Sequence, residues 1–201
     1  MLYGLLRLLF NPLFKGLFRL KVTGRKHLPQ QGGYILAANH MSNWDPPVLG
    51  TAMSVRLHFM AKLELFQIPL FGAAIRSLGA FPVKRGVADR TALRTAIDLL
   101  KEGKIVGIFP EGTRSKTGEL QKPAAGLEMI AAKAEVPVVP AAIYGTNRMF
   151  KNLFCLPQLE IHFGAPIYPP KKGDRKEDVP LSEQVMASIQ KMLDERAGKA
   201  S

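Results

Sequence analysis

The sequence contains little that would stabilise a fold covalently or through a metal ion. Cys155 is the single cysteine among 201 residues, so no intrachain disulfide can form, which suits a reducing compartment. The four histidines lie far apart and lack H-x-x-x-H spacing, so we expect no metal site. These two shortages argue against a disulfide-rich secreted domain and against a zinc enzyme.

Acidic residues are absent from the first 44 positions, and Asp45 is the first carboxylate in the chain. The basic residues of that stretch are Arg7, Lys15, Arg19, Lys21, Arg25 and Lys26. The whole chain has 28 Lys and Arg against 16 Asp and Glu, a formal net charge of +12. Hydrophobic residues make up 47%, which excludes a disordered tail protein. The uneven charge indicates an anionic partner: a nucleic acid, a membrane surface or a phosphorylated substrate.

Long apolar runs are missing from the first twenty residues, MLYGLLRLLFNPLFKGLFRL, so they do not form a transmembrane helix. Basic residues recur through the segment and no small-residue cleavage site follows, which argues against a signal peptide. On a helix the polar positions form one stripe, whose basic members are Arg7, Lys15 and Arg19. Leu and Phe side chains cover the rest of the helix, among them Phe10, Phe14 and Phe18.

A basic stripe beside a broad Leu/Phe face is typical of a helix that lies in a bilayer interface. Pro12 lacks an N–H group, so we expect two short helices joined near Asn11-Pro12. The alternative is a terminal helix that packs on the protein's own core. The pattern favours the first interpretation, with residues 1–20 as an amphipathic membrane anchor. It predicts a monotopic, peripheral protein at the cytoplasmic face of the cell membrane, bound to membrane lipids.

Residues 21–201 alternate short apolar runs with amphipathic stretches, and we expect them to form one domain. Strands are predicted over residues 34–38, 57–61, 80–83, 105–109, 136–144 and 159–163. Helices are predicted over residues 46–53, 69–78, 89–102, 124–135 and 181–196. Strands that alternate with helices predict an α/β fold with a mainly parallel sheet flanked by helices.

A histidine and a carboxylate follow the first of these strands, in the segment NHMSNWDP. Ligands of parallel sheets usually lie beyond the carboxyl ends of the strands. His40 needs a carboxylate to fix its tautomer if it acts as a base. Asp45 lies about 140° away round a helix, so the two can meet only if the chain turns between them. The alternative is that Asp45 caps the next helix and that His40 is satisfied within its loop.

Two later segments, GAFPVKRG and FPEGTRS, include the carboxyl ends of predicted strands, and in each at least one cation follows the strand. Lys84 and Arg85 suit a phosphate group, or they form a solvated surface pair. Arg114 can donate two hydrogen bonds to one phosphate group, while Glu111 can orient Arg114 or accept a hydrogen bond from a substrate hydroxyl. The segment also offers a glycine for close backbone approach and a hydroxyl, Gly112 and Thr113. The alternative is a charged turn with an internal ion pair.

The ordered set NHMSNWDP, GAFPVKRG, FPEGTRS and VPVVPAAIYG spans residues 39–145 and resembles the four motifs of the glycerolipid acyltransferases. The bacterial 1-acyl-sn-glycerol-3-phosphate acyltransferases are the most similar group. The resemblance implies that His40 is a general base oriented by Asp45. It also implies residues for the acceptor and its phosphate, namely Lys84, Arg85, Glu111, Gly112, Thr113 and Arg114.

The resemblance further implies transfer of a fatty acyl group from acyl-CoA or acyl-carrier protein to the sn-2 hydroxyl of lysophosphatidate, without a cofactor. Glycerol 3-phosphate or another lysophospholipid is the alternative acceptor, and a non-catalytic peripheral lipid-binding protein is the alternative class. A nucleic-acid partner is disfavoured, because such proteins interleave aromatic residues with exposed cations. Here the aromatic residues of the basic segment lie on an apolar helix face.

Overall fold

The structure is a computed structural model that describes residues 2–84, 86, 89–152, 155–170 and 179–198, the side chains of Leu2, Tyr3 and Arg7 excepted. Within that part of the chain, seven strands form one sheet in the order β1-β7-β6-β2-β5-β3-β4. The strands are β1 Lys21–Thr23, β2 Tyr34–Ala38, β3 Leu57–Lys62, β4 Phe81–Val83, β5 Ile105–Ile108, β6 Val138–Tyr144 and β7 Glu160–Phe163.

Five neighbouring strands of the sheet, β6, β2, β5, β3 and β4, run in the same direction. The two remaining strands run the other way, because β7 is antiparallel to β6 and β1 is parallel to β7. The mainly parallel sheet is therefore confirmed. The carboxyl ends of its five parallel strands meet at one edge, where ligands of such sheets usually lie.

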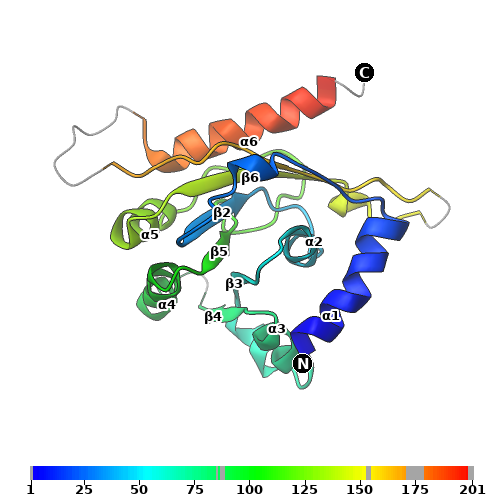
Figure 1. Cartoon of the computed structure of the whole chain (residues 1–201), viewed down its shortest axis with the longest axis horizontal. Coiled ribbons are helices and arrows are strands. Elements are labelled where there is room, and N and C mark those ends of the chain that lie inside the picture. The colour runs from blue at the N-terminus through cyan, green and yellow to red at the C-terminus, as the bar shows by residue number, and fades with distance from the viewer. Residues whose placement is uncertain (1, 85, 87–88, 153–154, 171–178, 199–201) are drawn as a thin grey trace.

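Helices cover both faces of the sheet (Figure 1). The α-helices are α1 Leu2–Asn11, α2 Asp45–Ala52, α3 Phe71–Ser77, α4 Arg90–Lys101, α5 Leu127–Ala134 and α6 Leu181–Gly198. Short helices of other types are η1 Pro12–Leu17, η2 Arg25–His27, η3 Leu63–Gln67 and η4 Thr146–Arg148. α4, α5 and α6 form one core with Ile35 and Ala37 of β2, whereas α2 forms another with Tyr34, Leu36 and Ala38. Alternate residues of β2 thus serve two cores, as the two-residue period of a strand requires.

The six predicted strands and the predicted helices are present, with shifts at their ends. β1 was not predicted, because a strand of three residues shows no periodicity of its own. α5 begins at Leu127 instead of residue 124, since Gly126 has a φ of +131° and interrupts the helical pattern. The Ala124 N–H is used elsewhere and donates to the Pro110 carbonyl at 2.7 Å.

The N-terminal segment divides where Pro12 predicted: α1 ends at Asn11, and the π-helix η1 begins at Pro12. Phe14 and Phe18 are 0% exposed and lie in the same core as α2. The prediction that these two rings face lipid is therefore wrong. They belong to the same cluster as buried residues of β6, β7 and α2, so these two rings share a core with the sheet.

Other apolar residues of this segment remain at the surface, namely Leu5, Leu8, Leu9 and Leu17. Phe10 is half-buried and stacks on Phe14. Lys15 is exposed, and the exposed Arg19 donates from its guanidinium to the Leu156 carbonyl at 3.2 Å. No helix in the described part of the chain is long and apolar enough to cross a membrane.

Candidate active site

A tight turn brings His40 and Asp45 together at the carboxyl end of β2. The Asp45 N–H donates to the Ser42 carbonyl at 3.2 Å, which closes the turn between them. His40 Nδ1 then lies 2.8 Å from Asp45 Oδ2. Asp45 is 0% exposed and His40 is 7% exposed, so water screens their interaction far less than that of a surface pair. The turn that the contact requires is therefore present.

Asp45 Oδ2 accepts three hydrogen bonds. Besides the His40 ring, the backbone N–H groups of Met41 and Ser42 donate to it at 2.7 and 2.8 Å. The alternative, in which Asp45 caps the following helix, is not observed, because α2 begins at Asp45 itself and the next two residues are prolines without N–H groups. The carboxylate turns back and binds the chain that precedes it.

The contact with Asp45 decides the tautomer of His40. A carboxylate can only accept, so Nδ1 carries the proton and donates it to Oδ2, and the lone pair is left on Nε2. The imidazole also stacks on Phe109, with ring centroids 4.0 Å apart and planes 15° from parallel. Stacking on Phe109 fixes the plane of the His40 ring, and the hydrogen bond to Asp45 fixes which way Nδ1 points. Nε2, with its lone pair, can accept a proton.

Glu111 holds the backbone around His40. Its Oε1 accepts the His40 N–H at 2.8 Å, and its Oε2 accepts the Gln121 N–H at 3.0 Å. Glu111 is buried and each of its oxygens already accepts one backbone N–H, so orienting Arg114 or accepting a substrate hydroxyl would come in addition to these contacts and stays a prediction. Glu111 is a positioning residue that connects the chain after β5 to the end of β2.

Asn39 provides a second connection, which the sequence did not reveal. Its side-chain amide donates to the Ile143 carbonyl at 3.0 Å, and its Oδ1 accepts the Ile143 N–H at 2.8 Å. The buried Asn39 thus joins the end of β2 to β6 directly before His40. Its place between a buried strand and the histidine was the available signal, but Asn is equally common in turns.

A cavity of about 140 Å³ opens beside the His40 ring. Its lining consists of His40, Met60, Val83, Gly107, Ile108, Phe109 and Gly112. Gly107 has no side chain to displace Phe59, and Phe59 in turn stacks on Phe109. Gly112 adopts a φ of +68°, which glycine permits without strain. The base therefore faces a small, mostly apolar space at the carboxyl ends of the strands.

Lys84 lies next to this cavity, because it directly follows Val83 in the chain and Val83 is part of the lining. Its side chain is exposed, and its backbone N–H donates to Asp89 Oδ2 at 2.8 Å. That hydrogen bond is the main cause of the lowered pKa of Asp89, whose Oδ1 also accepts two N–H groups at the start of α4. Asp89 thus binds backbone N–H groups both directly after β4 and at the start of α4. Arg85 lies outside the described residues.

Arg114 is another cation at this edge. It is exposed and immediately precedes Ser115, whose N–H donates to the His40 carbonyl at 2.8 Å. Thr113, also exposed, has its hydroxyl 3.4 Å from Gln121 Oε1. The described members of the predicted site after β2, β4 and β5 therefore lie at one edge of the sheet, whereas Phe14 and Phe18 belong to the core.

A family model described as Acyltransferase matches residues 19–144, which include the strands from β1 to β6 and the His40–Asp45 pair. The chain belongs to the acyltransferase family. The 1-acyl-sn-glycerol-3-phosphate acyltransferase of Bacillus subtilis (strain 168) is 37% identical to this acyltransferase over 150 residues, which are 74% of either chain. The protein of that name from Borreliella burgdorferi is 30% identical over 138 residues, 67% of this chain and 55% of that one.

A solved structure supports the same family. The crystal structure of PlsC, the 1-acyl-sn-glycerophosphate (LPA) acyltransferase from Thermotoga maritima, matches with a TM-score of 0.75 and 30% sequence identity. The match covers 95% of this chain and 79% of that protein, so it extends well beyond the residues that the family model matches.

We expect Glu111→Gln to disturb the site of this acyltransferase without removing a substrate contact. An amide offers one acceptor oxygen for two N–H donors, so unfolding free energy in urea should fall by about 1–3 kcal/mol. The kcat for acyl transfer should fall while the acceptor KM is unchanged. Glu119→Gln, at an exposed position nearby, should change neither quantity. A raised acceptor KM with normal kcat and stability would show that Glu111 contacts substrate.

Proposed function

We propose that the chain is a 1-acyl-sn-glycerol-3-phosphate acyltransferase of phospholipid biosynthesis. It transfers a fatty acyl group from acyl-CoA or acyl-carrier protein to the sn-2 hydroxyl of lysophosphatidate and forms phosphatidate. The observation that carries the proposal is the buried His40–Asp45 pair beside the cavity, with Lys84 and Arg114 on the segments next to it. The names of the Bacillus and Borreliella relatives support the same reaction.

In this reaction His40 Nε2 takes the proton of the sn-2 hydroxyl as the hydroxyl oxygen attacks the thioester carbonyl. The C–O bond forms, the carbonyl becomes a tetrahedral oxyanion, and its collapse breaks the C–S bond. The thiolate that leaves takes the proton from the imidazolium, so the thiol is released and His40 is restored. Asp45 stabilises the imidazolium between these steps, since its negative charge lies 2.8 Å from Nδ1.

Direct transfer between the two substrates fits the cavity better than an acyl-enzyme intermediate. Among the described residues, the cavity lining includes no serine, threonine or cysteine that could act as a nucleophile. Both substrates must then be bound together. The acceptor hydroxyl lies at His40, and the acyl chain extends along apolar residues such as Met60, Val83 and Ile108.

The phosphate of the acceptor binds to exposed cations at the rim. Lys84 and Arg114 come from two separate segments, so a phosphate between them would be held from two sides. Arginine can bind two phosphate oxygens at once, whereas lysine supplies a point charge. Arg85 completes the set that the motif implies. This arrangement supports a phosphorylated acceptor over a neutral one.

Replacement of the base is the direct test of the reaction. We expect His40→Ala to lower thiol release from acyl-CoA or acyl-carrier protein by about 10²–10⁴-fold, because general base catalysis is lost. His162→Gln is the matched control, since His162 lies on β7 and its ring contacts the Thr23 hydroxyl. Near-normal turnover of His40→Ala would contradict the mechanism. The same assay of the unchanged protein tests the alternatives. Transfer to glycerol 3-phosphate but not to lysophosphatidate would show that glycerol 3-phosphate is the acceptor. No transfer to either acceptor would favour a non-catalytic lipid-binding protein.

Charge reversal at the rim tests the phosphate site. We expect Arg114→Glu to raise the lysophosphatidate KM by about tenfold with little change in kcat, because a charge-assisted hydrogen bond becomes a repulsion. Arg94→Glu makes the same change of charge on the exposed face of α4 and should leave KM unchanged. Equal KM values for the two variants would refute a phosphate role for Arg114.

We also infer that the enzyme works as a peripheral membrane protein. Leu8 is 71% exposed on α1, and Leu70 is 88% exposed just before α3. α1 and α3 contact each other, and Figure 1 places α3 beside the N-terminal end of α1. Further exposed apolar residues of this surface are Leu5, Leu9, Leu17, Ile68 and Phe71. Exposed leucine, isoleucine and phenylalanine side chains on α1 and at α3 suit the apolar part of a bilayer interface. The exposed cations Lys15 on η1 and Arg76 on α3 suit its anionic headgroups.

Two acidic substitutions test this surface. The double change Leu8→Glu with Leu70→Glu should reduce binding to anionic vesicles by at least about tenfold, because two leucines can no longer be buried in lipid. Binding of the unchanged protein should be tighter at low salt. Val179→Glu, at an exposed position before α6, should bind like the unchanged protein. Equal partition of the double variant would refute the membrane role.

A further inference from the structure

A larger cavity, of about 740 Å³, opens at the other edge of the sheet. Tyr34 and Ile105, the first residues of β2 and β5, line it, as does His58 near the start of β3. β5 is parallel to both β2 and β3, so all three strands run from this cavity toward the edge at which His40 lies. The cavity is therefore separate from the candidate active site.

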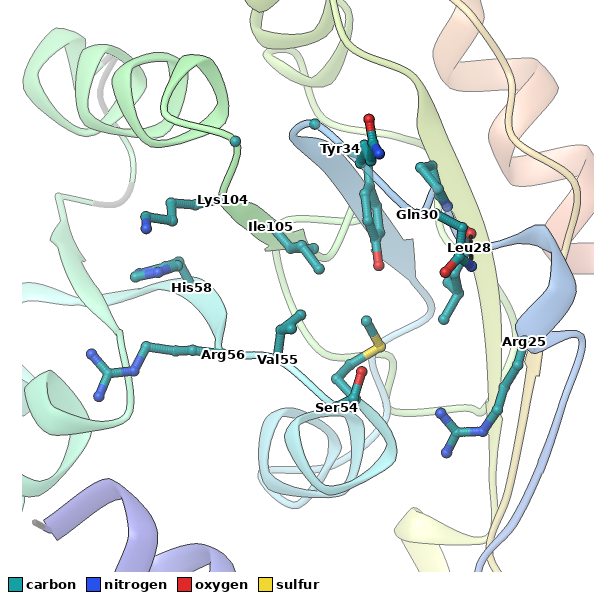
Figure 2. A pocket seen from close by; sticks show the side chains of 15 residues that line it. Arg25, Leu28, Gln30, Tyr34, Ser54, Val55, Arg56, His58, Lys104 and Ile105 are labelled. Atoms are coloured by element: carbon teal, nitrogen blue, oxygen red, sulfur yellow. Dashed lines mark hydrogen bonds between the residues drawn. The ribbon is translucent and has the colours of Figure 1, made fainter.

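Cations line this cavity, and its lining contains no carboxylate among the described residues. Arg25 belongs to η2, Arg56 and His58 lie on either side of the first residue of β3, and Lys104 precedes β5. Figure 2 shows the side chains of Lys104, His58 and Arg56 extending to the same side, with Ile105 and Val55 between them and Arg25. A concave surface with charges of one sign concentrates ions of the other sign.

Arg56 and His58 meet at Gly79, in the connection between α3 and β4. His58 Nδ1 lies 3.1 Å from the Gly79 carbonyl oxygen, so Nδ1 carries the proton and Nε2 the lone pair. A Cβ added at Gly79 would lie 3.1 Å from both His58 Nδ1 and Arg56 Cδ. The two basic side chains are thus held close together, and Gly79 leaves room for both.

The surroundings of His58 disfavour its charged form. Burial lowers the pKa of His58, and the charges of Arg56 and Lys104 lower it further, against the hydrogen bond to Gly79 and the charge of Glu102. A bound anion would offset these positive charges and raise that pKa. Protonated His58 would then donate from Nε2. Anion binding would take up a proton, so affinity should increase as the pH falls.

We propose that this cavity binds the phosphate group of an organic phosphate through Lys104, Arg56 and His58. The volume lies within the range of about 300–1,000 Å³ that is usual for small-molecule sites, so more than a bare inorganic anion fits. Apolar residues complete the lining for the rest of the ligand, namely Leu28, Met53, Val55 and Ile105. Arg25 lies on the other side of Ile105 and Val55, where it would meet a second acidic group of the ligand.

Two features oppose an anion here. Glu102 acts on His58 but does not line the cavity. The carboxyl end of α4 is also nearby, and helix ends of this kind carry partial negative charge. The amides of Gly103 and Lys104 already bind two of the last carbonyl oxygens of that helix. Arg56 and Lys104 beside His58, together with Arg25, therefore outweigh a single carboxylate.

The test follows the His58 ring by NMR in the full chain, with sulfate as the probe. Sulfate keeps its charge across the range used, whereas phosphate groups titrate near about pH 6. We expect sulfate to shift the His58 signals and to bind about tenfold more tightly near pH 5.5 than near pH 8. His58→Asn keeps an N–H for the Gly79 carbonyl but has no Nε2. The ring signals missing from its spectrum identify those of His58, and its affinity for sulfate should no longer depend on pH.

Charge variants separate a built site from general attraction to a basic protein. Lys104→Glu should weaken sulfate binding by about tenfold, and the exposed Arg25→Glu provides a second variant across the cavity. Lys133→Glu makes the same change on the exposed face of α5 and should have no effect. Equal weakening by Lys104→Glu and Lys133→Glu would overturn the proposal, as would His58 signals that sulfate does not move.

Two further additions identify the source of the phosphate. A His58 shift with glycerol 3-phosphate in solution would indicate a soluble ligand. A shift with phosphatidylcholine vesicles only when they contain phosphatidate would indicate a lipid headgroup, and either result supports the proposal. The measurement is independent of acyl transfer, because His40→Ala should respond to sulfate like the unchanged protein. A failure of the proposed reaction would therefore leave this test intact.

Discussion

The hydrogen bonds to one oxygen of Asp45 are the constraint on which the candidate active site depends. A buried carboxylate needs donors, and here they come from the His40 ring and from the backbone of Met41 and Ser42. These donors can converge only if the chain reverses direction between residues 40 and 45. The hydrogen bonds to Oδ2 therefore also shape the turn and orient the His40 ring, so one oxygen serves both the fold and the proposed chemistry.

The sheet gives this turn a rigid support. Asn39 binds the backbone of β6, and Glu111 binds the backbone of His40 from the segment after β5. β6 and β5 are the two neighbours of β2 in the sheet. The loop that carries His40 is thus held from both sides by polar side chains whose partners are backbone groups. Such contacts hold a reacting group within a fraction of an ångström, as catalysis requires.

The sequence predicted the features that depend on local pattern. Strand and helix periods located the elements, and the turn residues between His40 and Asp45 allowed the pair. Phe14 and Phe18 were misplaced because a lipid bilayer and the protein's own core both accept apolar side chains, and local spacing does not distinguish them. The role of Glu111 was missed because its partners are backbone N–H groups, which every segment possesses. The sequence shows which donors exist but not which ones a fold brings to a given carboxylate.

Trp44, the residue before Asp45, packs against Phe14 of the N-terminal segment with ring centroids 6.2 Å apart. It also contacts Phe150, which in turn packs on Phe18. The segment is therefore braced against the turn and does not act as a loose tether. On a lipid surface, the height and tilt of the imidazole would be fixed by aromatic packing. Deleting the first twenty residues would then damage the chemistry directly, even toward a substrate dispersed in detergent.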